Sequence, residues 1–275
     1  MAAKSLRAPT TILGIDFSGA KDAHRKIWIA TGVIERGVLH IEDCQSAQEL
    51  LGVTDRDQCL SALRDFISLQ SPCAVGLDFP FGLPKNAVTS STWEEFAVSF
   101  GQLYPTVGKF DEAFRAPSGH REERRDTDSE CKTPFSPFNL RLYRQTYYGI
   151  RDVLAPLVRD RLACILPMQV ASPQLPWLLE ICPASTLARL GLRRPYKGPG
   201  AEKRAARTLI LEAIEKKGMV TISSSMLRAA VIGNPGGDAL DSVTAALATC
   251  QAIHHPVHPS SLGPDPSNVE GHVYI

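Results

Sequence analysis

Residues 11–16 read Thr-Ile-Leu-Gly-Ile-Asp, a short apolar run that ends on a carboxylate. Aliphatic and β-branched side chains in such a run favour a buried strand. Ending that strand on Asp16 takes a charge out of water, which is costly unless a partner compensates for it. Turn chemistry explains an acid between Ile15 and Phe17 poorly. We therefore expect Asp16 to meet other charged groups at the end of a first strand.

The segments that follow predict three antiparallel strands, a helix and a fourth strand. Residues 26–35 are rich in β-branched and aromatic side chains, and residues 38–43 form a third run after Gly37. Short strands with tight connections are typical of an antiparallel meander. Residues 57–69 have apolar side chains at helical spacing. The apolar run that ends at Asp78 then predicts a buried strand parallel to the first.

A proline-rich region separates this strand from the rest of the fold. Residues 85–175 are too long for a plain loop, and we interpret them as an insertion that covers the carboxylate edge of the sheet. Within it, a short helix is expected to begin at Trp93 behind a capping box. A second helix is expected over residues 150–164, kinked at Pro156.

The last third of the chain predicts one further buried strand and two helices. In order, we expect a strand over 177–181 that carries Glu180, a basic amphipathic helix over 202–217, a final helix over 238–253, an extended tail over 254–268 and an edge strand over 271–275.

Composition excludes several classes of protein. A chain of 275 residues that is 44% hydrophobic suits one large α/β domain or two small ones, and we expect a single domain over residues 1–275. A net charge of +1 gives no global attraction to nucleic acid or membrane. Long apolar runs and a signal-peptide core are lacking, so no membrane partner is expected and the expected location is the cytoplasm. Seven cysteines without a Cys-x-x-Cys pair predict neither a disulfide framework nor a zinc cluster.

The final helix carries two more acids. Asp238 and Asp241 are three residues apart and share one side of the helix, away from Leu240, Val243 and Leu247. A purely structural interpretation is available for each: Asp238 follows two glycines and suits an N-cap, and Asp241 favours the helix dipole. Asp78 likewise suits a turn before Pro80. The ordered set of acids on strand one, strand four and the last helix favours a shared site instead.

That order of motifs resembles the ribonuclease H-like superfamily, particularly its Holliday-junction resolvase branch. More specifically, the chain resembles a family of predicted nucleases catalogued as domain-of-unknown-function family 429. The segments that carry the resemblance are Gly14-Ile-Asp16, Gly76-Leu-Asp-Phe-Pro-Phe-Gly-Leu-Pro84, Arg125-Asp-Thr-Asp128, Glu180-Ile-Cys-Pro-Ala184, Tyr196-Lys-Gly198 and Asp238-Ala-Leu-Asp-Ser242. Together they span roughly residues 11–253.

The resemblance implies a ribonuclease H-like α/β fold. Its five-stranded mixed sheet would have three antiparallel strands and then two parallel ones, with flanking helices and the insertion after strand four. It also implies phosphodiester hydrolysis with two Mg²⁺ or Mn²⁺ ions about 3.5–4 Å apart. Hard carboxylate oxygens suit these ions better than zinc.

Roles for the individual residues follow from the resemblance. Asp16 would bridge the two ions, and Asp78 and Asp241 would each complete one coordination shell. Glu180 or Asp238 would serve as a further ligand or orient water. The expected phosphate contacts are Lys197 first and Arg125 second.

The expected function is therefore a metal-dependent nuclease whose substrate is DNA or RNA. Two alternatives stay open at this stage. One is a non-catalytic nucleic-acid-binding or scaffold protein of the same fold, which the near-neutral charge favours. The other is a phosphotransferase of the actin and sugar-kinase type, whose first strand also reads Gly-x-Asp. The sequence leaves the oligomeric state open, a homodimer included.

Overall fold

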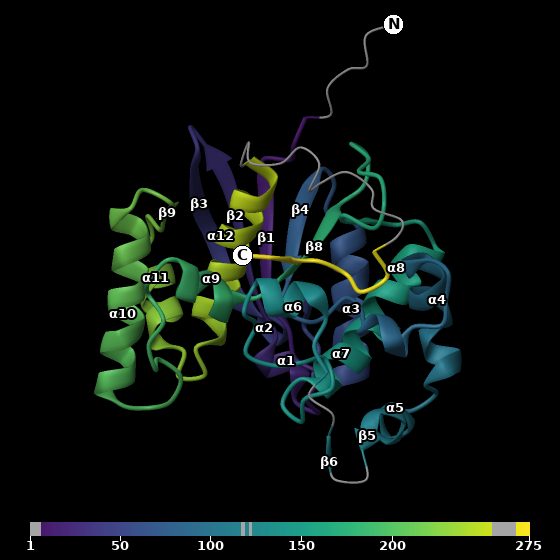
Figure 1. Cartoon of the computed structure of the whole chain (residues 1–275). Coiled ribbons are helices and arrows are strands. Elements are labelled where there is room, and N and C mark those ends of the chain that lie inside the picture. The colour runs from purple at the N-terminus through teal and green to yellow at the C-terminus, as the bar shows by residue number, and fades with distance from the viewer. Residues whose placement is uncertain (1–6, 117–118, 121–122, 255–267) are drawn as a thin grey trace, which may run out of the picture.

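A mixed β-sheet forms the centre of the molecule (Figure 1). The computed structural model describes residues 7–116, 119–120, 123–254 and 268–275. The strand order is β10-β8-β4-β1-β2-β3-β9, with β7 beside β8, and β5 and β6 pair separately. The strands are β1 Thr11–Asp16, β2 Trp28–Glu35, β3 Val38–Ser46, β4 Cys73–Leu77, β5 Arg115–Ala116, β6 Gly119–His120, β7 Cys164–Ile165, β8 Trp177–Ile181, β9 Val220–Thr221 and β10 Val273–Tyr274.

The pairing confirms an α/β protein whose sheet mixes antiparallel and parallel strands. β1, β2 and β3 are antiparallel neighbours, and β4 and β8 then continue the sheet parallel to β1. The sheet is wider than the five strands expected, because two-residue strands extend it: β9 beside β3, β10 beside β8, and β7 also on β8. The predicted edge strand near the end of the chain is β10.

Helices cover both faces of the sheet. They are α1 Ala23–Lys26, α2 Ala47–Leu51, α3 Arg56–Ser68, α4 Trp93–Leu103, α5 Val107–Phe114, α6 Asp126–Glu130, α7 Tyr143–Tyr148, α8 Ala155–Arg159, α9 Pro183–Arg189, α10 Ala201–Lys216, α11 Ser225–Gly233 and α12 Asp238–His254, with a 3-10 turn η1 at Lys85–Ala87 and a π-helix η2 at Gly149–Leu154. No helix in the described ranges is both long and apolar enough to cross a membrane.

One helix prediction needs correction. The segment expected as a single kinked helix over 150–164 is a π-helical turn that runs into α8, which ends at Arg159. Pro156 therefore lies inside a helical run that is continuous from Tyr143 to Arg159, directly after the π-helical turn where the hydrogen-bonding pattern changes. The tail expected over 254–268, with its histidines, lies almost wholly outside the described residues.

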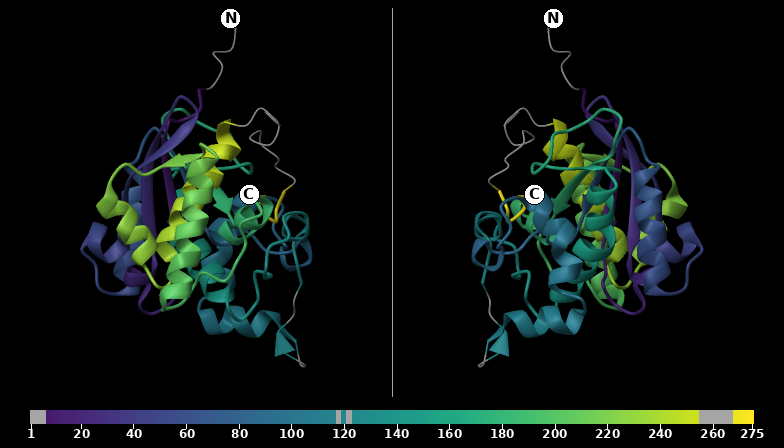
Figure 2. Two further views of the ribbon diagram at one scale, coloured as in Figure 1. Left: turned by 90° about the vertical axis from the view of Figure 1, so that its left-hand side faces the viewer. Right: turned by 90° about the vertical axis from the view of Figure 1, so that its right-hand side faces the viewer.

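Two hydrophobic clusters hold the layers together, one on each face of the sheet. Leu13, Ile15 and Val75 pack with α3, whereas Ile12 and Ala74 on the alternate positions pack with α12. This alternation follows the two-residue period of a strand. The side views of Figure 2 show the blue α3 and the yellow α12 on opposite sides of the strands. β1, β4 and β8 are therefore buried on both faces, as their apolar sequences predict.

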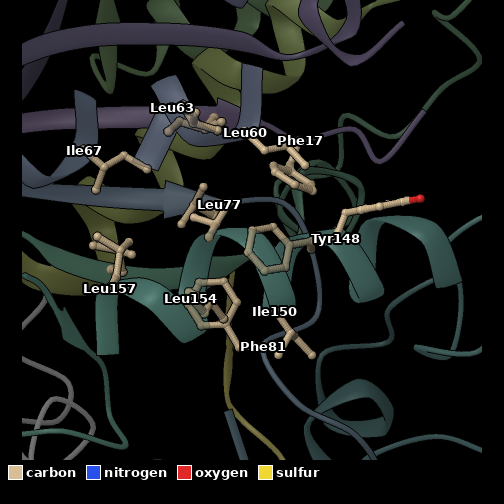
Figure 3. Packing of buried hydrophobic residues seen from close by; sticks show 14 of the residues in the cluster. Phe17, Leu60, Leu63, Ile67, Leu77, Phe81, Tyr148, Ile150, Leu154 and Leu157 are labelled. Atoms are coloured by element: carbon tan, nitrogen blue, oxygen red, sulfur yellow. The ribbon is translucent and has the colours of Figure 1, made fainter. Parts of the chain in front are cut away.

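Aromatic side chains anchor the insertion to the strand ends. The ring of Phe79 packs between those of Phe17 and Phe81, with centroids 4.6 and 5.0 Å away. The backbone of Gly149 lies directly against Phe79, where a Cβ would overlap the ring. Figure 3 shows this region, with Phe17, Leu77, Phe81, Ile150 and Leu154 in one cluster. The packing fixes the backbone on either side of Asp16 and Asp78.

Candidate active site

Two of the predicted acids are neighbours at the ends of adjacent parallel strands. Asp16 is the last residue of β1, and Asp78 follows β4 directly, with its backbone N–H donated to the Ile15 carbonyl at 3.0 Å. Burial raises the pKa of Asp16, and the charge of Asp78 contributes to the rise, because two like charges at neighbouring strand ends do not both ionise readily.

The third acid arrives on α12 because two strand glycines let the helix come close. A Cβ on Gly14 of β1 would overlap the backbone of Ser242 and Ala246, and one on Gly76 of β4 would overlap the Thr249 hydroxyl. Glycine is the residue that permits such an approach between backbones. Asp241 thereby reaches the strand ends while only 2% exposed. The two strand glycines are therefore the sequence feature that allows α12 to approach the sheet.

A lysine and a tyrosine bind both oxygens of Asp241. The Lys197 ammonium lies 2.6 Å from Oδ2, and the Tyr196 hydroxyl donates to Oδ1. The turn that presents them is held by Arg207, which is 2% exposed and donates to the carbonyl oxygens of Tyr196 and Gly198 at 2.7 and 3.2 Å. The Lys197 side chain itself is 57% exposed, whereas the Asp241 side chain that its ammonium contacts is 3% exposed.

Burial and mutual repulsion set the protonation of the acids. Burial first, and then the charge of Asp241, raises the pKa of Asp16 well above its usual range. The same two causes raise the pKa of Asp78 to about 7. Lys197 opposes both shifts, and its own pKa is raised by Asp241 and Asp16 against the effect of burial. The site thus holds more negative charge than Lys197 neutralises, which is the electrostatic condition for binding a cation.

Asp238 lies at the start of α12 and lines the same pocket. Burial raises its pKa, with Lys197 opposing the rise. The expected N-cap role falls instead to the side chain of Asn234, whose Oδ1 accepts the Asp238 N–H at 2.8 Å. The carboxylate of Asp238 is therefore not needed for capping. Asn234 belongs to the turn at residues 233–237, so the N-cap interpretation that the sequence left open for Asp238 is wrong.

Glu180 and Arg125 belong to a buried ion network beside the three aspartates. Arg125 is 1% exposed, and its Nε, Nη1 and Nη2 atoms donate five hydrogen bonds to Asp128, Glu180 and the Glu270 carbonyl. All five N–H donors of a guanidinium are thus used. The expected phosphate contact through Arg125 is corrected accordingly: this side chain is structural. Glu180 lines the same pocket, and its oxygens already accept hydrogen bonds from Arg125 and from the Phe81 N–H.

The aspartates lie in a pocket of about 670 Å³. Buried acids form its floor, and exposed basic side chains surround its mouth. The exposed basic residues that line it are Lys26, Arg141, Arg144, Arg193, Arg194 and Lys197, and the buried Arg125 lines it as well. The part of the wall between residues 133 and 145 consists of Thr133, Pro134, Phe135, Arg141, Leu142, Arg144 and Gln145. Carboxylates at the floor and basic side chains at the mouth suit a phosphate ester whose phosphate contacts a cation held by the carboxylates.

The donor atoms suit Mg²⁺ or Mn²⁺ in kind, but the arrangement leaves Asp241 occupied. Among the described residues, no three His, Cys, Asp or Glu side chains are placed to hold one ion. The cause is visible at Asp241, whose oxygens bind Tyr196 and Lys197. Asp16 and Asp78 could hold a cation together, and Asp241 could join them once Lys197 moves away.

Comparisons of the chain with protein-family models, with curated proteins and with solved structures found no match.

Proposed function

We propose that the chain is a metal-dependent phosphodiesterase of the ribonuclease H-like type that hydrolyses nucleic acid. The observation that carries the proposal is the meeting of Asp16, Asp78 and Asp241 in one pocket. They come from two neighbouring parallel strands and a helix that is distant in sequence. The order of the five longer strands, with β1 between its antiparallel and parallel neighbours, supports the same fold type.

Each side chain has a role in this proposal. Asp16 and Asp78 hold the divalent cation, and Asp241 completes the shell after releasing Lys197. When bound, Mg²⁺ or Mn²⁺ would activate the attacking water and stabilise charge on the leaving oxygen. Tyr196 keeps Asp241 oriented, and the freed Lys197 ammonium contacts the phosphate. Arg193 and Arg194 at the mouth attract the adjoining phosphates.

One observation favours the second candidate, a nucleic-acid-binding protein without catalytic activity. The Lys197–Asp241 ion pair neutralises part of the site without any metal. A protein that had lost catalysis could keep this pair as a substitute for the cation. The two candidates differ in a measurable way, because only the enzyme requires Mn²⁺ or Mg²⁺ to displace Lys197.

The experiment compares the wild type with Asp16→Asn in a cleavage assay. Metal-stripped protein is given Mn²⁺ and labelled single-stranded and duplex DNA and RNA. The wild type should cleave at least one substrate, and Asp16→Asn should be at least about 100-fold slower while unfolding at the same or a higher temperature. Asp65→Asn, whose carboxylate is 62% exposed on α3, is the matched control and should cleave like the wild type. Absence of both cleavage and millimolar Mn²⁺ binding would favour the non-catalytic protein.

A further inference from the structure

The shape of the pocket restricts what can reach the aspartates. Asp16 is 7% exposed and Asp241 is 2% exposed, so a reacting phosphate has to enter the cavity. The cavity of about 670 Å³ lies within the roughly 300–1,000 Å³ typical of small-molecule sites. Paired and stacked bases hold a duplex backbone on the outside of a stiff cylinder. A nucleotide freed from the stack can enter a pocket of this kind.

The lining supplies partners for both halves of such a nucleotide. Phe135, Leu142, Pro183, Leu187 and Pro195 give the wall an apolar part that suits a base. Phe135 offers an aromatic ring in this wall, and the Arg141 guanidinium lies 5.6 Å from the centroid of that ring. Arg193 and Arg194 are exposed and form no ion pair within the described part of the chain. Their charge is therefore available to a phosphate.

From this lining we infer that the pocket takes one unpaired nucleotide at a time, with its base on the apolar wall and its phosphate between the aspartates and the arginine pair. The inference names the substrate class of the proposed nuclease and rests on that function only for the cleavage step. A single-stranded nucleic acid and a free nucleotide offer the same chemistry. The test therefore separates the two sources.

Binding is measured by fluorescence anisotropy with Ca²⁺, which supports cation-mediated binding without requiring turnover. The probes are a labelled 12-nucleotide oligothymidylate and a blunt 12-base-pair duplex, with thymidine monophosphate as competitor. The single strand should bind at least tenfold tighter than the duplex. If the monophosphate competes at equal nucleotide concentration, the ligand of the pocket is a small free nucleotide. If it competes only at great excess, the ligand is a single-stranded nucleic acid.

Two variants test the assigned contacts. Phe135→Ala should weaken binding of the single strand about tenfold through lost stacking, and the double change Arg193→Met with Arg194→Met should weaken it by a similar factor and reduce its salt dependence. Lys217→Met, exposed beyond the end of α10, should bind like the wild type. Equal or tighter binding of the duplex, no binding of either probe, or normal binding by both variants would overturn the inference. Selective binding of the single strand without cleavage would instead contradict only the proposed nuclease activity.

Discussion

The contact between Lys197 and Asp241 leads to a sharp prediction. The Lys197 ammonium occupies the position beside Asp241 where the proposed function requires a divalent metal ion. The ammonium lies 2.6 Å from Asp241 Oδ2 and also opposes the raised pKa of Asp16 and of Asp78. The change Lys197→Met keeps the length of the side chain and removes its charge. A metal ion then meets three carboxylates without a competitor.

The magnitude follows from Coulomb's law and the exposure of the lysine. Two unit charges about 4 Å apart attract by about 4 kcal/mol near a protein surface. Lys197 is 57% exposed, so solvent and salt reduce that to about 1–2 kcal/mol. Because 1.4 kcal/mol corresponds to tenfold in affinity, Lys197→Met should bind Mn²⁺ about tenfold tighter. Without metal, the variant should lose about 1 kcal/mol of unfolding free energy, since Asp241 loses its cation.

The assay is a titration with Mn²⁺ followed by electron paramagnetic resonance of the free ion, together with urea unfolding in EDTA and in Mn²⁺. Lys217→Met removes a lysine that does not line the pocket and serves as the matched control. The wild type and the control should bind Mn²⁺ alike. Unchanged or weaker binding by Lys197→Met would refute the reasoning, because the ammonium would then not occupy the position of the metal ion.

Three other variants test the balance of forces around the site. Burial raises the pKa of Asp78 to about 7, so the folded state retains a proton that the unfolded state has released. Metal-free stability should therefore fall from about pH 4 to pH 8, and Asp78→Asn should remove about 4 kcal/mol of that fall in urea titrations. Arg125→Met should cost about 3–5 kcal/mol in the same assay, because it leaves buried carboxylates unpaired; a loss under 1 kcal/mol would contradict the structural role. Gly14→Ala should lower the melting temperature and weaken Mn²⁺ binding by forcing α12 off β1, whereas Gly233→Ala, with open space around it, should do neither.

The fold and the acid cluster were predictable because each depends on local patterns in the chain. The strand that ends at Asp16 and the helix that carries Asp241 are visible as periodicity, and adjacent parallel strands bring their ends together. Lys197 was predicted to lie in the site, but its contact with Asp241 was not. That contact depends on a turn held from α10 by Arg207, and no spacing rule encodes a bond between a side chain and a distant carbonyl.

The role of Arg125 was beyond sequence reasoning for the same reason. An arginine in a basic stretch looks like a surface contact, and only its pairing with Glu180, 55 residues away, shows it to be buried. Arg125 also donates a hydrogen bond to the Glu270 carbonyl, and the segment that contains Glu270 has no strong sequence pattern. Gly14 and Gly76 did carry a usable signal. A glycine in the middle of an apolar strand indicates a close backbone approach, and the two together predict that another element packs closely on this part of the sheet.

The distribution of positive charge bears on whether the site is functional or a structural relic. Arg125 is committed to Glu180 and Asp128, and Lys197 to Asp241. Within the described residues, Asp16 and Asp78 have no ion-pair partner of their own, and burial raises the pKa of both. Such a pair lowers stability at neutral pH, so an apolar or amide replacement would strengthen the metal-free fold. Two stability-lowering carboxylates, placed at neighbouring ends of β1 and β4 in one pocket, therefore favour the proposed cation site over a purely structural role.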